Sequence, residues 1–264
     1  MKKRSPTRAA ASPALPEATI SEEGGLRYLH LETPWIQGAM RIRQPLKLEL
    51  DYIQRMMAWL LLREPEDLPD TRCLQLGLGA AAITKYCHQV LQLPTTAVEL
   101  NPQVVAACRN WFKLPPDGDG LQVVLGDAGR YVADPAHASS AEALCVDLYD
   151  QEAASPVLDG EDFYRDCHRV LAHGGVMTVN LFGRDASFDR SAARIAAAFG
   201  AERTVMFKPT TEGNTIVMAW RDFALPAREL LAQRAETLQT RWKLPARKWV
   251  KLLSTYTPAR STTP

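Results

Sequence analysis

Apolar runs of strand length alternate with helix-favouring segments through the middle of the chain. The runs that predict buried strands cover residues 74–76, 95–100, 121–125, 143–147 and 176–182. Helices are expected between them, beginning after residue 79 and covering 102–112 and 163–171, and a further helix is expected after the last run, at 191–199. Strands and helices that alternate on this scale predict a doubly wound α/β domain with a parallel sheet.

The pattern changes at the end of this domain. Residues 205–208 and 214–220 are two further apolar runs, and they are separated by the turn string PTTEG instead of a helix. Two strands in direct succession predict an antiparallel hairpin at the edge of the sheet. We therefore expect a mostly parallel, seven-stranded sheet with an antiparallel edge hairpin, in a domain over residues 70–222.

The residues before this domain divide into two parts. Residues 1–19 are rich in Ala, Pro, Ser and basic residues without apolar periodicity, which predicts a disordered tail. Residues 20–69 combine alternating segments at 26–31 and 35–43, which predict a small β-hairpin or lid, with an amphipathic helix near residues 50–61. This helix is expected to pack on the main sheet.

The residues after the domain predict helices. In residues 223–264, leucine and tryptophan recur among many basic residues between 227 and 253, so two amphipathic helices are expected, with Pro245 starting the second. They would pack on the same chain or form the contact of a homodimer. A basic anchor for acidic partners is the lesser alternative.

Composition limits the classes of protein that remain. The 264 residues, of which 46% are apolar, suffice for one large core, and the 31 basic and 30 acidic residues leave a net charge of +1. A protein that holds phosphate backbones by charge is usually more basic, so nucleic acid is not the expected partner. The five cysteines form no CxxC pair, and no apolar run approaches the about 20 residues of a membrane span. We expect a cytoplasmic protein with buried thiols and no metal site.

Candidate chemistry begins at the glycine turn after the first strand. Gly77 and Gly79 allow the backbone to turn sharply and to approach a ligand closely. A GxG turn alone is weak support, but Glu99 follows Gly79 by 20 residues at the end of the second strand. A carboxylate at that position can accept hydrogen bonds from the two hydroxyls of a ribose. Asp127 and Asp147 also follow strands, at the sheet edge where such folds bind ligands.

The order of these motifs resembles the spermidine synthase (polyamine aminopropyltransferase) family over about residues 25–220. The antiparallel ending is typical of the Rossmann-like fold of S-adenosylmethionine-dependent methyltransferases, which this family shares. The resemblance implies that Gly77 and Gly79 lie beside a sulfonium ligand and that Glu99 holds its ribose. It also implies that Asp127 and Ala128, in the string GDA, clasp the adenine.

The resemblance assigns the acceptor side of the site as well. Asp147 and Asp150, in DLYDQ, match the aspartates of the family's D-x-x-D-P signature, of which the first is assigned to catalysis and both help to hold the amine. Tyr149 lies between them. Tyr52 falls where the family has a tyrosine, and Gln37 corresponds loosely to a glutamine of the amino-terminal β region.

The reaction that the resemblance implies moves an aminopropyl group from decarboxylated S-adenosylmethionine to a small amine such as putrescine, without a metal. A protonated amine has no lone pair, so a carboxylate must accept its proton, and Asp147 is the candidate. The chain departs from the family pattern at three positions. Ala80 replaces an aspartate that meets the donor's amine, Gln54 replaces a glutamate, and Gln151 replaces the signature proline.

Two alternatives stay open at this point. A methyltransferase on the same fold would keep the nucleoside-binding residues and use ordinary S-adenosylmethionine, and Ala80 is compatible with that. A non-catalytic nucleoside-binding protein would bind the ligand without turnover.

Overall fold

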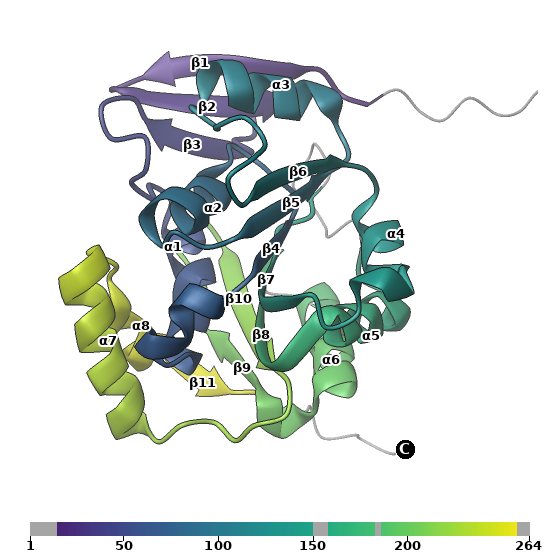
Figure 1. The fold of residues 1–264 in the computed structure, drawn as a ribbon, viewed down its shortest axis with the longest axis vertical. Coiled ribbons are helices and arrows are strands. Elements are labelled where there is room, and N and C mark those ends of the chain that lie inside the picture. Colours follow the sequence, from purple (N-terminus) through teal and green to yellow (C-terminus); the bar gives the residue numbers. More distant parts are fainter. Residues whose placement is uncertain (1–14, 150–157, 183–185, 258–264) are drawn as a thin grey trace, which may run out of the picture.

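The chain forms a large mixed sheet covered by helices and a small antiparallel sheet above it (Figure 1). The computed structural model describes residues 15–149, 158–182 and 186–257. The small sheet has the order β1-β2-β3, with β1 at Ala18–Glu23, β2 at Leu26–Leu31 and β3 at Gly38–Arg41. Strand β1 was not predicted, and it begins inside the stretch expected to be a tail. Only its residues Ala18 and Ile20 show the apolar alternation of a half-buried strand.

The main sheet has the order β11-β9-β10-β8-β7-β4-β5-β6. Its strands are β4 at Cys73–Leu76, β5 at Thr95–Glu99, β6 at Leu121–Leu125, β7 at Ala141–Val146, β8 at Leu171–Phe182, β9 at Thr204–Phe207, β10 at Asn214–Trp220 and β11 at Leu253–Thr255. Strands β6, β5, β4, β7 and β8 are parallel neighbours, and β10, β9 and β11 continue the sheet antiparallel. The predicted fold class is therefore confirmed.

Over the described residues, the main sheet has eight strands instead of the expected seven, because β11 joins it. Ser254 of β11 pairs with Met206 of β9, so the β9–β10 hairpin does not form the sheet edge. The sequence pattern could not predict this strand, since Leu253 and its neighbours continue the apolar periodicity of the preceding helix.

The described residues form eight α-helices, most of them at the expected places between strands. They are α1 at Asp51–Met56, α2 at Ala82–Lys85, α3 at Pro102–Trp111, α4 at Ala128–Ala133, α5 at Glu161–Val170, α6 at Ala186–Phe199, α7 at Arg228–Trp242 and α8 at Ala246–Leu252. A 3-10 helix, η1 at Met57–Leu62, prolongs α1, and a π-helical turn, η3 at Tyr86–Val90, prolongs α2. Helix α4 was not predicted, whereas Pro245 caps the start of α8 as expected.

Each face of the main sheet buries its own apolar cluster. Alternation along β10 sends Ile216 and Met218 to the face covered by η1, α7 and α8, and Val217 and Ala219 to the face covered by α5 and α6. A third cluster joins the small sheet to α3 and to the turn after β4. No helix within the described ranges is long and apolar enough to span a bilayer.

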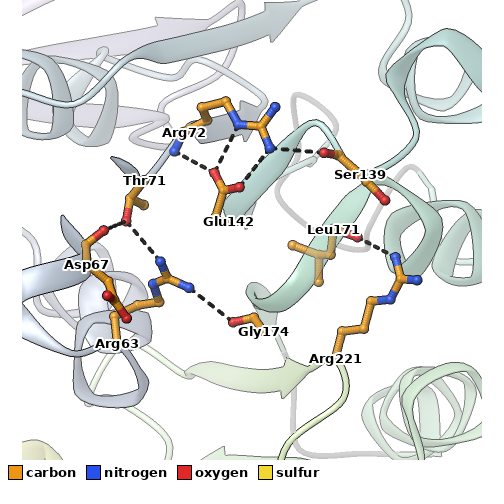
Figure 2. Close-up of polar contacts among 9 residues, drawn as sticks. All are labelled: Arg63, Asp67, Thr71, Arg72, Ser139, Glu142, Leu171, Gly174 and Arg221. Carbon is orange, nitrogen blue, oxygen red and sulfur yellow. Dashed lines mark hydrogen bonds and ion pairs between the residues drawn. The ribbon is translucent and has the colours of Figure 1, made fainter. Parts of the chain in front are cut away.

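Arginine side chains tie together the edge of the sheet where the parallel strands begin (Figure 2). Arg72, which precedes β4, forms an ion pair of 2.7 Å with Glu142 of β7. Arg221 donates a hydrogen bond of 2.6 Å to the carbonyl of Leu171, the first residue of β8 (Figure 2). Arg63 donates to the carbonyl of Gly174 in the same strand at 3.4 Å. These arginines therefore stabilise the amino ends of the parallel strands, whereas the cavity described below lies at their carboxyl ends.

Candidate functional site

A cavity of about 1100 Å³ lies at the carboxyl edge of the parallel strands. Every predicted site residue within the described ranges lines it: Gln37, Tyr52, Gly77, Gly79, Glu99, Asp127, Ala128, Asp147 and Tyr149. The one remaining predicted site residue, Asp150, lies outside the described residues, as does Gln151, which replaces the signature proline. The structure therefore brings together residues that are more than 100 positions apart in the sequence.

The glycine turn between β4 and α2 is held in a conformation that requires glycine. Gly77 has a φ of +85°, and a Cβ atom there would lie 2.1 Å from the carbonyl oxygen of Asp147. Buried Gln75 fixes the turn, because its Nε2 donates to the Gly77 carbonyl at 2.6 Å. Thr84 of α2 in turn donates to Oε1 of Gln75 at 2.5 Å. The turn is thus rigid and closely apposed to the residue after β7.

Glu99 connects this turn to the start of α3. Its Oε2 accepts a hydrogen bond from the Leu78 amide and its Oε1 accepts one from the Asn101 amide, both at 2.9 Å. Burial raises the pKa of the Glu99 carboxyl, and these backbone hydrogen bonds oppose that rise. The amide of Leu78, between the two glycines of the turn, is therefore already bonded to Glu99. A carboxylate has about four lone-pair sites, so capacity remains for a hydroxyl donor.

Asp127 and Ala128 lie at the start of α4. The Oδ1 atom of Asp127 accepts a hydrogen bond from the Arg130 amide at 2.8 Å, so this side chain caps the helix. Leu100, which is 50% exposed, and Leu158 also line the cavity. These apolar side chains were not predicted as site residues, although Leu100 directly follows Glu99.

Asp147 stands just beyond the end of β7 at the inner wall of the cavity. Its Oδ1 accepts a hydrogen bond from Nδ2 of Asn180 at 2.9 Å, and its Oδ2 lies 3.4 Å from the Tyr52 hydroxyl. Burial raises the pKa of the Asp147 carboxyl to about 6, although both hydrogen bonds act to lower it. Burial and the neighbouring Asp147 charge raise the pKa of Tyr52 well above its usual value. Asp147 can therefore take up a proton near neutral pH, whereas Tyr52 stays protonated.

Two asparagines of the site were missed by the sequence analysis. Asn180 of β8 and Asn214 of β10 line the cavity, and Nδ2 of Asn214 donates to Oδ1 of Asn180 at 3.1 Å. The Tyr149 hydroxyl donates to the Asn180 carbonyl at 2.9 Å. One signal was available: Asn180 is a lone amide in the otherwise apolar end of the run VMTVNLF. A buried amide in such a strand needs specific hydrogen-bond partners.

The charge of the cavity wall has a single sign among the described residues. Its lining includes no Lys, Arg or His, and its acidic members are Glu49, Asp51, Glu99, Asp127, Asp147 and Glu212. Glu49 is paired with Arg41, and Asp51 with Arg55, so their charges are partly balanced from behind the wall. The remaining carboxylates produce a negative potential that favours cationic ligands.

Two of the departures from the family pattern have a structural explanation. Ala80 is 3% exposed beneath Gly38 of β3, and a Cβ atom on Gly38 would lie 2.6 Å from that of Ala80. A longer side chain at position 80 would therefore displace β3. Gln54 does not line the cavity, and its side-chain amide donates to the Leu48 carbonyl at 2.8 Å. Over the described parts of the chain, no cluster of His, Cys, Asp and Glu could hold a metal ion.

No protein-family model matches the chain. Named relatives do match: a polyamine aminopropyltransferase of Chromobacterium violaceum is 35% identical over 243 residues, which cover 91% of this chain and 90% of the relative. A second, from Neisseria meningitidis serogroup A, is 33% identical over 212 residues, covering 80% of this chain and 78% of the relative.

Solved structures agree in fold. A probable spermidine synthase from Corynebacterium glutamicum superimposes with a TM-score of 0.69 at 18% identity, covering 94% of this chain and 95% of that one. Human methyltransferase-like protein 13 in complex with SAH gives a TM-score of 0.64 at 21% identity, covering 81% and 98%.

The fold and its acidic cavity thus define a protein of the architecture that spermidine synthases and S-adenosylmethionine methyltransferases share. On sequence, the chain belongs to the polyamine aminopropyltransferase family, whose members are transferases.

Proposed function

We propose that the protein transfers an aminopropyl group from decarboxylated S-adenosylmethionine to a small amine such as putrescine. The observation that carries this proposal is the acidic wall of the cavity, which within the described residues has no basic side chain. Both substrates of such a transfer are cations, a sulfonium and an amine, and both favour a negative potential. The names of the relatives support the same reaction.

The nucleoside half of the cavity fits the donor. Glu99 would accept hydrogen bonds from the ribose hydroxyls through its remaining lone pairs. Asp127 and Ala128 would contact the adenine, and the turn at Gly77 and Gly79 would lie along the sulfonium chain. Because the turn is anchored through Gln75 and Glu99, these contacts would need little rearrangement when the donor binds.

The acceptor half centres on Asp147. The neutral amine attacks the carbon beside the sulfur, the C–S bond breaks with its electron pair passing to sulfur, and a thioether leaves. Asp147, with a pKa raised by burial to about 6, would take the proton of the incoming ammonium and so supply the neutral amine for this attack, and the product leaves as a secondary ammonium. Tyr52, Tyr149, Gln37 and Asp150 would orient the amine.

Product analysis distinguishes the candidate reactions. The protein is incubated with putrescine and either decarboxylated or ordinary S-adenosylmethionine, and the nucleoside products are separated by liquid chromatography. The proposal expects methylthioadenosine from the decarboxylated donor. S-adenosylhomocysteine from the ordinary donor would indicate a methyltransferase instead, and binding of either donor without any product would indicate a non-catalytic protein.

A further inference from the structure

Asn180 occupies a position where its amide orientation matters. It is 4% exposed on β8, between two buried apolar residues, so neither its donor nor its acceptor can be satisfied by bulk water. Its Nδ2 donates to Asp147 at 2.9 Å, whereas the opposite orientation would set a carbonyl oxygen against a carboxylate. Asn180 therefore acts on Asp147 as a donor only while its amide is held in one orientation.

Asn214 holds that orientation from the neighbouring strand. Its Nδ2 donates to Oδ1 of Asn180 at 3.1 Å, which leaves the Asn180 nitrogen to face Asp147. The backbone of Asn214 is fixed by the β9–β10 turn, because its backbone carbonyl accepts from the Thr210 backbone amide at 2.7 Å and its backbone amide donates to the Thr210 hydroxyl at 3.1 Å. The two amides thus form a directed chain of hydrogen bonds across β10 and β8 to the carboxylate beyond β7.

This chain makes the two oxygens of Asp147 unequal. Oδ1 accepts a hydrogen bond from Asn180 at 2.9 Å, whereas among the described residues Oδ2 has only the long contact of 3.4 Å with the Tyr52 hydroxyl. We propose that Asn214 and Asn180 are positioning residues, which act in series to keep Asp147 ionised and to present Oδ2 to the proton of the acceptor amine. This proposal rests on the proposed aminopropyl transfer, although the chain of hydrogen bonds itself can be tested without turnover.

The groups that face Asp147 support a role for the amide chain. Tyr52 on α1 and Tyr149 beyond β7 carry no charge, Cys145 of β7 is a buried thiol, and Glu49 lines a small adjoining cavity that Asp147 also lines. None of these groups supplies a positive charge, and Glu49 adds a negative one. The Asn180 donor is therefore the main contact that favours the ionised carboxylate against its burial.

Isosteric substitutions test the direction of the chain. In Asn214→Asp, the new carboxylate would accept from Asn180 Nδ2, so the Asn180 amide would rotate and set its oxygen against Asp147. In Asn180→Asp, two carboxylates would share one site and one of them would stay protonated. Both changes should move the acid limb of kcat/KM to higher pH by about one unit or more, which lowers kcat/KM about tenfold at pH 5 and about twofold at pH 7. Donor affinity should stay within about twofold, because neither residue belongs to the nucleoside half.

Thr215→Val provides the control, since Thr215 is a buried neighbour on β10 that does not line the cavity. It should leave the pH profile unchanged. The titration of Asp147 is also followed by carbon NMR of labelled aspartate, assigned by comparison with Asp147→Asn, and this measurement needs no turnover.

The pKa of Asp147 should rise in both asparagine variants. If Asp147 keeps its wild-type pKa in Asn214→Asp, Asn214 does not act on Asp147 through Asn180. If Asp147 keeps its wild-type pKa in both variants, neither asparagine is a positioning residue. Failure of the proposed reaction would appear separately, as a wild-type protein that forms no product.

Discussion

Asp147→Asn should increase stability while it removes activity. Burial raises the pKa of this carboxyl to about 6, compared with about 3.9 for an aspartate in an unfolded chain. A difference of about two pKa units means that the ionised carboxylate lowers the free energy of unfolding by about 3 kcal/mol at neutral pH. Since Asp147 is only half-buried and faces the cavity, solvent reduces this cost. We expect the substitution to raise the free energy of unfolding by about 1 to 2 kcal/mol at pH 7.5.

The pH dependence of this gain follows from the sign of the shift. The folded protein binds the Asp147 proton more tightly than the unfolded chain, so the wild type regains stability as the pH falls from about 6 towards 4. The advantage of the variant should accordingly be largest above pH 7 and should vanish near pH 4. Urea unfolding of both proteins over this range measures the difference, and Asp70→Asn, at an exposed position, is the matched control.

Turnover should change in the opposite direction. Asparagine keeps the size of the side chain but cannot accept the amine's proton, so kcat should fall by about 10²-fold or more, while nucleoside affinity changes little. The wild-type rate should rise with pH as more free amine forms, and this dependence should persist in the residual activity of the variant. An Asp147→Asn protein with the wild-type rate would refute the proton-acceptor role and make Asp150 the next acid to test. A variant that is less stable than the wild type at pH 7.5 would refute the electrostatic reasoning.

Three further predictions concern the scaffold and the donor. Gly77→Ala should lower the free energy of unfolding, measured by thermal denaturation, by about 2 to 4 kcal/mol, because its Cβ would lie 2.1 Å from the Asp147 carbonyl oxygen. Gly25→Ala is the control: Gly25 also has a left-handed backbone but no neighbour within 4 Å, so the loss should be about 1 kcal/mol. Glu99→Ala should weaken calorimetric binding of the sulfonium nucleoside by about 1 to 3 kcal/mol, and unchanged affinity in a folded variant would remove Glu99 from the site. Burial lowers the pKa of Lys85 to about 8, against about 10.4 in the unfolded chain. The unfolded chain therefore binds this proton more tightly, and the free energy of unfolding should rise from pH 8 to pH 10. The same rise in Lys85→Met would contradict this assignment.

The sequence predicted those parts of the fold that depend on local patterns. Gly77 and Glu99 were found because a glycine turn and a carboxylate at a strand end have a fixed spacing within one βαβ unit. Asn180 and Asn214 were missed because their role depends on the pairing of β8 with β10, and nothing local specifies which amide meets which carboxylate.

Other misses have the same origin. Leu253–Thr255 continues an amphipathic pattern and becomes a strand only because the edge of β9 is free to pair with it. Gln54 shares a helix with Tyr52, but the direction of its side chain is set by the backbone carbonyl of Leu48, which no periodicity reveals. Tertiary contacts thus decide which of the polar residues on a predicted element reach the cavity.

The amine product of a complete reaction distinguishes aminopropyl transfer from the alternative reactions. Wild-type protein and Asp147→Asn are incubated with decarboxylated S-adenosylmethionine and putrescine, and the amines are identified by mass spectrometry. We expect a polyamine lengthened by one aminopropyl group from the wild type, and about 10²-fold less of it from the variant. A methylated amine in place of the lengthened one, or equal product from both proteins, would contradict it.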